Sequence, residues 1–329
     1  MNPYIGHDSQ VYGIEEHRLT GGKGDGMRLL EIHNGIGLDL AVTPDRCGDI
    51  ARLRYKGVNM SYMTPVGYVA PAFYDRTEDN FLKSFTAGFL TTCGLESAGA
   101  PSEDLGVRYP MHGSIANQPC EQLSWGEEGT DLIVRMAVKD ERLFGRKLRL
   151  ERRIVVSTVQ NVFEIRDRIV NTGDRKEGVE ILYHMNMGYP LLDEDSVLTI
   201  PSVRVEPYTD WAAQGIGEWM KMTKPQAQIE EQCYRHVFAD GKGYARIAQP
   251  KLDTALTITF DAKDLDGFTE WKMMGVRDYV LGLEPGNCYP GPRGWMRETG
   301  MLKYLEAGES HEYAVRVELG SCTEEEKSK

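Results

Sequence analysis

The sequence predicts an all-β protein, mainly antiparallel, folded as a sandwich with few short helices. In most of its short apolar stretches, apolar and polar residues alternate with a period of two, which places every second side chain on the same face of a strand. The 35 glycines and 15 prolines interrupt these stretches at short intervals, as turns between strands do. Many short strands separated by turns are typical of an antiparallel sandwich.

The clearest strand signals lie in the middle of the chain. In residues 147–157, leucines occupy one face and charged residues the other, and residues 162–170 repeat the pattern, as expected of strands with one wet face. Turn-forming residues at hairpin spacing follow each strand, at 158–161 and 171–174. We therefore expect a long antiparallel meander. Further strands are predicted at residues 27–33, 37–42, 132–138, 179–184, 198–200, 255–260, 279–283 and 312–319.

Helical patterns are few. The strongest of these weak patterns cover residues 75–85 and 227–234, and we predict short helices there. No repeat of fixed period is present, and the only segment of low complexity is the acidic end, residues 323–329. We expect this tail to be frayed.

The composition limits the kinds of binding partner and the cellular compartment that we expect for this protein. The chain has 38 Lys and Arg against 50 Asp and Glu, a formal net charge of −12, which argues against nucleic acid or an anionic membrane as partner. No apolar run approaches the roughly 18 residues of a membrane-spanning helix, and the first thirty residues lack the pattern of a secretory signal. The six cysteines are widely spaced without a CxxC pair, which favours reduced thiols. We expect a soluble, cytoplasmic protein.

Three residues stand out as candidates for chemistry. His112 precedes a glycine in YPMHGSIAN, and His184 lies in YHMNMGYP at the end of a predicted strand. Glu284 ends an apolar strand in LGLEPGN, and an apolar neighbourhood raises the pKa of a carboxyl group toward that of a general base at neutral pH. Taken singly, each has a structural alternative: a hydrogen-bonded loop or sheet-edge histidine, or a solvated turn carboxylate.

Two other polar turns are weaker candidates. Arg46, in PDRCGD, could present its planar fork to sugar hydroxyls or be held by Asp45 or Asp49 in a surface turn. Glu96, in TTCGLESAGA, is either a site residue or the partner of a turn amide. Phosphate-loop and nucleophile-elbow motifs are absent from the sequence.

The order of these motifs resembles that of the aldose 1-epimerase (galactose mutarotase-like) superfamily, over about residues 25–320: an early arginine turn, a His-Gly turn, a second histidine at a strand end and a late Leu-Glu-Pro. It is most similar to a poorly characterised aldose-1-epimerase-like branch. The resemblance implies a β-supersandwich forming a single catalytic domain over residues 1–329. It also implies an isomerase that acts on a small-molecule sugar without a cofactor.

The resemblance further implies roles for individual residues. Glu284 resembles the general base that removes the anomeric proton, and His184 the general acid that protonates the ring oxygen. His112 resembles the second active-site histidine, and Arg46 the arginine that binds sugar hydroxyls. The turn from His112 to Asn117 is similar to the His-Gly-Phe-Ala-Arg-Asn turn of hexose-phosphate mutarotases, which makes Asn117 a substrate-binding candidate, as is Glu96. Ala116 replaces the arginine of that turn, and the family's substrate-binding aspartate has no match between His184 and Glu284.

Two other classes of function stay open at this stage. Two histidines and a glutamate could bind a divalent metal for aldose–ketose isomerisation or epimerisation at carbon. A sandwich of this kind could also bind carbohydrate without catalysis. The mutarotase interpretation requires no metal and is favoured because both proton-transfer residues are present. Whether the chain forms a homodimer is left open.

Overall fold

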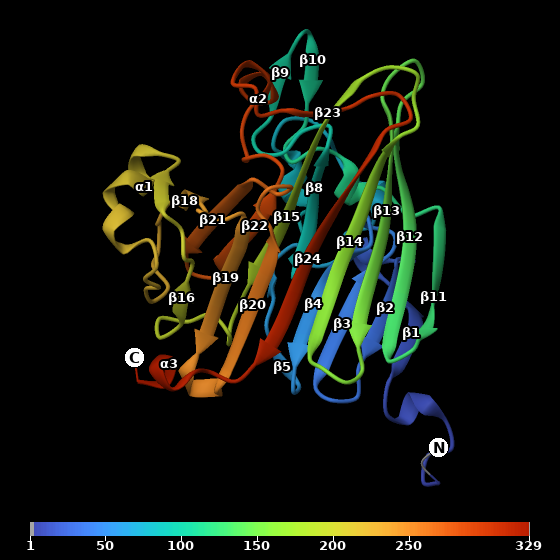
Figure 1. The fold of residues 1–329 in the computed structure, drawn as a ribbon, viewed down its shortest axis with the longest axis vertical. Helices are drawn as coiled ribbons and strands as arrows, with labels where there is room; N and C mark the ends of the chain where they lie inside the picture. The colour runs from blue at the N-terminus through green and yellow to red at the C-terminus, as the bar shows by residue number, and fades with distance from the viewer. Residues whose placement is uncertain (1–2, 329) are drawn as a thin grey trace.

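The computed structural model describes residues 3–328 and consists mainly of antiparallel sheets (Figure 1). The largest is an eight-stranded sheet at the front of Figure 1. Its strands, in spatial order, are β11 (Gln122–Glu128), β12 (Asp131–Glu141), β13 (Lys147–Ser157), β14 (Val162–Asn171), β24 (Ser310–Gly320), β20 (Thr254–Asp261), β19 (Lys242–Gln249) and β16 (Val197–Thr199).

Two further sheets lie behind this one. One runs β17 (Arg204–Pro207), β18 (Gln232–Val237), β21 (Gly267–Met274), β22 (Tyr279–Gly286), β15 (Glu177–Met187) and β23 (Lys303–Leu305), with β8 (Leu90–Leu95) also paired to β15. The other runs β1 (Gly13–Arg18), β2 (Arg28–His33), β3 (Leu38–Thr43), β4 (Asp49–Tyr55) and β5 (Val58–Asn59).

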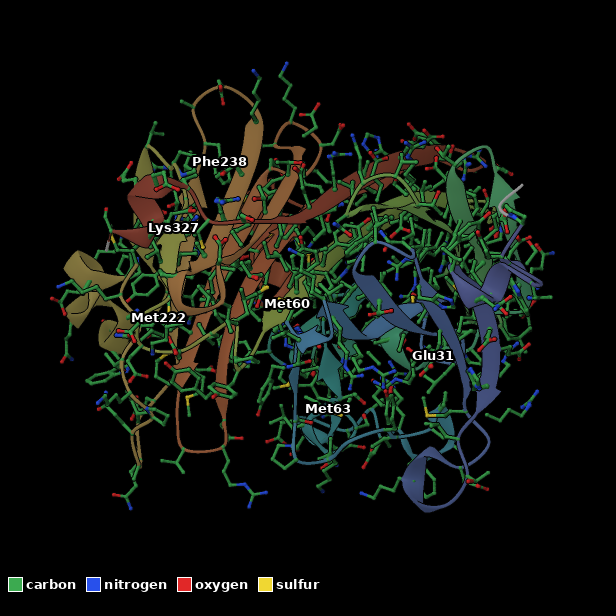
Figure 2. The ribbon with its side chains drawn as sticks, turned by 90° about the horizontal axis from the view of Figure 1, so that it is seen from below. Glu31, Met60, Met63, Met222, Phe238 and Lys327 are labelled. Atoms are coloured by element: carbon green, nitrogen blue, oxygen red, sulfur yellow. The ribbon has the colours of Figure 1, made fainter. Side chains whose placement is uncertain are left out.

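Small elements complete the fold. Two short hairpins are β6 (Tyr62–Met63) with β7 (Ala87–Gly88), and β9 (Ser102–Asp104) with β10 (Val107–Tyr109). The α-helices of the described residues are α1 (Asp210–Gln214), α2 (Arg293–Glu298) and α3 (Glu324–Lys327). Seen from below in Figure 2, the strands near Glu31 and those near Phe238 occupy opposite sides of the molecule, with Met60 between them. Within residues 3–328, no helix is both long and apolar enough to cross a bilayer.

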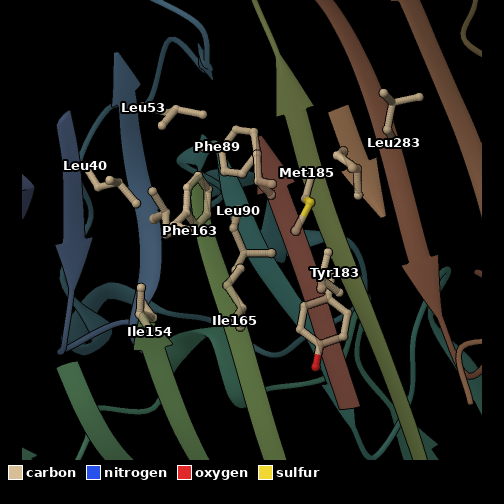
Figure 3. Close-up of a cluster of buried hydrophobic side chains, with 14 of the residues drawn as sticks. Leu40, Leu53, Phe89, Leu90, Ile154, Phe163, Ile165, Tyr183, Met185 and Leu283 are labelled. Carbon is tan, nitrogen blue, oxygen red and sulfur yellow. The ribbon is translucent and has the colours of Figure 1, made fainter. Parts of the chain in front are cut away.

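The core lies between the sheets, and the period-two pattern explains it. Every second residue of β13 is buried, from Leu148 to Val156, so its apolar face packs inward. Figure 3 shows side chains of all three sheets meeting there, among them Leu40 of β3, Phe163 of β14 and Met185 of β15. The predicted all-β sandwich is confirmed.

The meander is shorter than predicted. Strands β11 to β14 follow one another as neighbours, but the turn at 171–174 does not form a hairpin, because β14 pairs with β24 and the chain crosses to the second sheet as β15. All residues of β15 after the first are buried. A strand covered on both faces loses the alternation that marks a half-exposed one.

Both helix predictions are wrong. Within residues 75–85 only Asn80–Lys83 is helical, as one 3₁₀ turn, and residues 227–234 contain no helix. Instead β18 begins at Gln232 and pairs with β21, so pairing with a distant strand overrides a weak local preference.

The predicted fraying of the acidic tail is also wrong for residues 323–328, while residue 329 lies outside the described residues. Thr323 caps α3 in a capping box with Glu326. The Glu326 carboxylate accepts hydrogen bonds from Nε and Nη2 of Arg246, at 2.7 and 3.0 Å. A bidentate ion pair therefore holds the tail against β19.

Candidate active site

A cavity of about 630 Å³ opens over the sheet that contains β21, β22 and β15. Its wall combines strand residues with loops that precede β7, β9, α1 and α2 and the loop that follows β10. Apolar and aromatic side chains supply much of the lining, as is usual for a small-molecule site. The titratable side chains in the wall are Tyr62, His112, His184, Tyr208, Glu231, Cys233, Asp278 and Glu284.

Neighbouring strands bring His184 and Glu284 together. Met185 pairs with Leu283 in the ladder between β15 and β22, which puts the preceding histidine beside the following glutamate. Their atoms Nε2 and Oε1 lie 3.3 Å apart, and both side chains are buried. Gly282 leaves room for the carboxylate, because a methyl group added there would overlap Oε1 of Glu284.

The hydrogen-bonding capacity of the His184–Glu284 pair is not fully used despite this close contact. Nδ1 of His184 and Oε1 of Glu284 are buried, and neither makes a hydrogen bond within the described part of the chain. The 3.3 Å approach is therefore close without the alignment of a hydrogen bond. Buried polar atoms are normally bonded in native proteins, so this pair has bonding capacity that the described chain does not use.

A tight loop carries His112 to the same cavity. Its φ of 56° is left-handed, and its backbone is held by bonds from its N–H to the Gly99 carbonyl, 2.8 Å, and from the Gly94 N–H to its own carbonyl, 3.0 Å. Nδ1 accepts the Gly99 N–H at 3.2 Å. The neutral ring therefore carries its proton on Nε2. The ring centroids of His112 and His184 are 5.6 Å apart.

Aromatic rings surround both histidines. Phe85 and Trp271 lie 5.3 and 5.2 Å from the His184 ring, and Phe81 lies 5.2 Å from the His112 ring. Burial lowers the pKa of His112 to about 4. Burial and the neighbouring His112 lower the pKa of His184 to about 3.

The pKa of Glu284 shifts in the opposite direction. Burial, with the charge of Glu231 adding to it, raises the pKa of Glu284 well above its ordinary value. The empty site thus favours a protonated carboxyl group and a neutral His184. This pair holds one transferable proton, the same number as an imidazolium beside a carboxylate. It can therefore accept a proton at one atom while donating one at the other.

Glu231 is a wall residue that sequence reasoning missed. Its Oε2 accepts the indole N–H of Trp271 at 2.7 Å. It lies between His184 and Glu284 in the sequence, the interval in which no family aspartate could be matched. The available signal was a carboxylate directly before a strand, and the helix predicted over 227–234 concealed it.

The structure does not place Arg46 in the wall of this cavity. Its Nε donates to the carbonyl of Ala116 at 2.8 Å, and its Nη1 donates to those of Val69 and Ser84 at 2.8 and 2.9 Å. The expectation that Arg46 lines the cleft with the histidines is wrong, because backbone carbonyls of three loops occupy these donors. Neither Asp45 nor Asp49 forms an ion pair with Arg46 within the described residues, so the alternative surface turn is not formed either.

Glu96 and Asn117 also lie outside the cavity wall. Glu96 forms ion pairs with Arg146 and Arg76, 3.2 and 3.6 Å, and accepts the Ser114 hydroxyl at 2.9 Å. Asn117 is buried in the turn after His112, and neither side-chain polar atom has a hydrogen-bond partner in the described chain. The cavity therefore gathers His112, His184 and Glu284 but none of the three predicted substrate-binding residues. Across residues 3–328, no three His, Cys, Asp or Glu side chains are grouped so as to hold a metal ion.

The antiparallel sandwich and its His–His–Glu cavity define a galactose mutarotase-like protein. More particularly, the chain belongs to the family described as "Domain of unknown function (DUF4432)", whose model matches residues 24–319.

Solved structures support the same class. A Klebsiella pneumoniae protein described as a "putative aldose 1-epimerase" superposes with a TM-score of 0.90 at 25% identity, covering 98% of this chain and 88% of that one. A galactose mutarotase-like protein of Clostridium acetobutylicum gives 0.67 at 13% identity, covering 95% and 100%. Galactose 1-epimerase of Lactobacillus acidophilus gives 0.65 at 11% identity, covering 95% and 100%. No curated protein sequence matches the chain.

Proposed function

We propose that the protein is an aldose 1-epimerase, interconverting the anomers of a free sugar by general acid–base ring opening. The observation that carries the proposal is the His184–Glu284 pair, 3.3 Å apart and not saturated, in the wall of a cavity of about 630 Å³. A sugar hydroxyl and a ring oxygen are the donor and acceptor that such a pair can serve. The similarity to aldose 1-epimerases in fold supports the same assignment.

The reaction needs one proton removed and one delivered. Once the pair's single proton has passed from Glu284 to His184, Glu284 removes the proton of the anomeric hydroxyl while His184 protonates the ring oxygen, and the ring carbon–oxygen bond breaks as the aldehyde forms. Rotation about the bond between C1 and C2 presents the other face of the aldehyde. Reclosure with the protons returned yields the opposite anomer. Each positioned transfer contributes roughly 10²–10⁴-fold.

Other wall residues assist without exchanging the reacting proton. The Nε2–H of His112, fixed by the bond from Gly99 to Nδ1, is a donor for the ring-oxygen side of the sugar. Trp271 offers an apolar ring face beside His184, and its bond to Glu231 orients a carboxylate toward sugar hydroxyls. This assigns to Glu231 the hydroxyl-binding part expected of Arg46.

NMR anomerisation kinetics test the proposal. The purified protein is added to freshly dissolved single anomers of a panel of free aldoses and sugar acids, and the spectra are followed for the other anomer and for ketose or C2-epimer signals. Faster anomer exchange that is lost in Glu284→Gln supports the proposal. Ketose or carbon-epimer signals would point to the isomerase alternative. Sugar binding without any catalysis would point to a binding protein.

A further inference from the structure

One row of side chains crosses the sheet below the cavity. In the ladders, Arg235 of β18 is opposite Thr269 of β21, and Thr269 is opposite Glu284 of β22. Directly opposed residues of antiparallel strands point to the same face. Because Thr269 and Glu284 line the cavity, Arg235 lies on the cavity side of the sheet. Two strand spacings, about 10 Å, separate it from Glu284.

Arg235 has an acidic neighbour with which it does not pair: Glu206 of β17 is directly opposite it in the ladder, but that carboxylate pairs with Arg204 at 3.0 Å. Its guanidinium carbon lies 4.5 Å from the ring centroid of Tyr208, 4.8 Å from that of Trp295 and 5.2 Å from that of Tyr289. These cation–π contacts hold the guanidinium in place. None of the ion pairs found within residues 3–328 includes Arg235, and its Nε is buried without a hydrogen bond.

Other arginines with little exposure have bonded partners, which are backbone carbonyls for Arg46 and acidic side chains for two more. Arg28 is paired with Asp45 at 2.6 Å, and Arg146 with Asp140 at 2.8 Å. A chain with 50 acidic residues can readily supply counter-ions. A half-buried cation without one is costly, so its presence beside the cavity indicates a counter-ion that arrives with a ligand.

The residues around Arg235 indicate where the counter-ion of the ligand lies. Tyr208 belongs both to the ring set around Arg235 and to the cavity wall, so the guanidinium lies directly behind that wall. Between Arg235 and Glu284, the hydroxyl of Thr269 is buried in the row without a hydrogen bond. The Glu231 carboxylate lies at the end of the cavity away from Arg235, because four residues of extended chain, about 13 Å, separate the two.

We propose that Arg235 provides the counter-charge for an anionic group of the substrate, so that the preferred substrate is an acidic aldose bearing a carboxylate or a phosphate. The proposal rests on the proposed function, since the reacting anomeric centre must lie at Glu284 and His184. The anionic group then lies at the Tyr208 end, where weak solvent screening strengthens its attraction to the guanidinium. Arg235 thereby supplies from β18 the positive charge that Ala116 does not supply in the turn after His112.

Matched sugars that differ only at C6 give the sharpest test. D-fucose, D-galactose and D-galacturonate carry methyl, hydroxymethyl and carboxylate groups, as do 6-deoxy-D-glucose, D-glucose and D-glucuronate, and D-glucose 6-phosphate adds the phosphate. In anomerisation assays we expect kcat/KM to be highest for the acidic member of a series. Arg235→Gln should lower that value roughly 10–100-fold, mainly through KM, the range of a lost charge-assisted hydrogen bond. The neutral members should change little.

Two controls separate recognition from folding. Arg235→Lys keeps the charge and should restore part of the preference, and thermal unfolding of both variants reports any loss of the ring contacts. Arg168→Gln removes an exposed arginine of β14, in the eight-stranded sheet, which pairs with Glu151 at 3.0 Å. It should leave all substrates unchanged. Comparing the uronates with glucose 6-phosphate decides whether the anion is a carboxylate or a phosphate.

The outcomes are distinct from those of the proposed function. If wild type prefers the neutral sugars, or if Arg235→Gln lowers kcat/KM equally for neutral and acidic sugars, the inference about Arg235 is overturned while the epimerase proposal stands. If no sugar is anomerised, calorimetric binding of the same uronates and glucose 6-phosphate decides. Binding that is lost in Arg235→Gln keeps the inference without the epimerase, and absence of binding to wild type rejects it.

Discussion

Two groups of buried charged side chains in this protein differ in how fully they are bonded. The first joins Arg152 of β13 to Asp167 of β14 and Asp49 of β4. The second is the His184–Glu284 pair in the cavity. Both groups are almost completely buried, so burial alone does not distinguish a structural group from one suited to catalysis.

The first group is saturated. The Asp167 carboxylate accepts two bonds from Arg152, 2.9 and 2.7 Å, and the Tyr183 hydroxyl at 2.9 Å. Asp49 accepts from Arg152 at 3.1 Å and from the backbone and hydroxyl of Thr92, 3.0 and 2.6 Å. This network ties strands of the three sheets together with each carboxylate hydrogen-bonded, which is the condition for tolerating buried charge.

The second group is left incomplete. One nitrogen of His184 and one oxygen of Glu284 have no hydrogen bond within the described structure, and both groups are shifted toward their uncharged forms. Buried polar atoms left without partners, next to open volume, mark the place where a ligand completes the bonding. Arg235 and Thr269 also carry such atoms.

The largest expected effect is on catalysis by the incomplete pair. Glu284→Gln keeps the size of the side chain and removes the base, so turnover on a true substrate should fall roughly 10²–10⁴-fold, with a much smaller change in sugar binding. His184→Asn should behave alike, and the double variant should lose little more than either single one because both serve one event. NMR anomerisation measures all three. Wild-type turnover by Glu284→Gln would refute the mechanism.

For the saturated network around Arg152 we expect the opposite result, a large loss of stability with little change in turnover. Asp167→Asn removes the bidentate charge partner of the buried Arg152, which keeps only the single ion pair to Asp49, and should lower the free energy of unfolding by about 3–5 kcal/mol. Turnover per folded molecule should stay near wild type. Denaturant unfolding measures the free energy of unfolding, and NMR anomerisation kinetics measure the turnover. Glu151→Gln, which removes a partly exposed partner of Arg168, is the control and should cost about 1 kcal/mol or less. Equal losses in the two variants would contradict the distinction.

A smaller effect is expected from moving the Glu284 carboxylate without removing it. In Gly282→Ala the new methyl group would overlap Oε1 of Glu284, so the carboxylate must shift. A displacement of about 1 Å can cost about 10²-fold in rate, while stability should change little because the end of a flexible side chain gives way. Gly126→Ala in β11 meets no atom within 4 Å and serves as the control. Unchanged anomerisation by Gly282→Ala would mean that the carboxylate position is not critical.

The smallest effect concerns pH. The charge of Glu231 adds to the raised pKa of Glu284, so Glu231→Gln should lower that pKa. Glu284 then loses its proton at lower pH. Because the pair holds a single proton, on Glu284 beside a neutral His184, this loss forms the alkaline limb of the pH profile of kcat/KM, which should move to lower pH. Glu206→Gln, on the neighbouring β17, should leave the limb in place. A shift of the limb to higher pH would contradict the electrostatic coupling of the two carboxylates.

Local sequence predicted the half-exposed strands well. The segment predicted at 147–157 matches β13, and those at 162–170 and 312–319 fall within β14 and β24, because one wet face preserves the alternation. Strands such as β8 and β18 were missed. All of β8 is buried, which removes the alternation, and β18 depends on pairing with β21, a distant segment.

By itself, the sequence determined the sandwich class and the three chemical residues His112, His184 and Glu284, since alternation and distinctive local motifs are properties of neighbouring residues. Only the tertiary structure decided which polar groups share the cavity. The donors of Arg46 are occupied by carbonyls from three separate loops. Glu231 lines the cavity, and the pairing of β18 with β21 places Arg235 behind the Tyr208 wall. The physical reason is that strand pairing joins segments far apart in the chain, so whether a buried polar atom finds a partner is settled only when the sheets close.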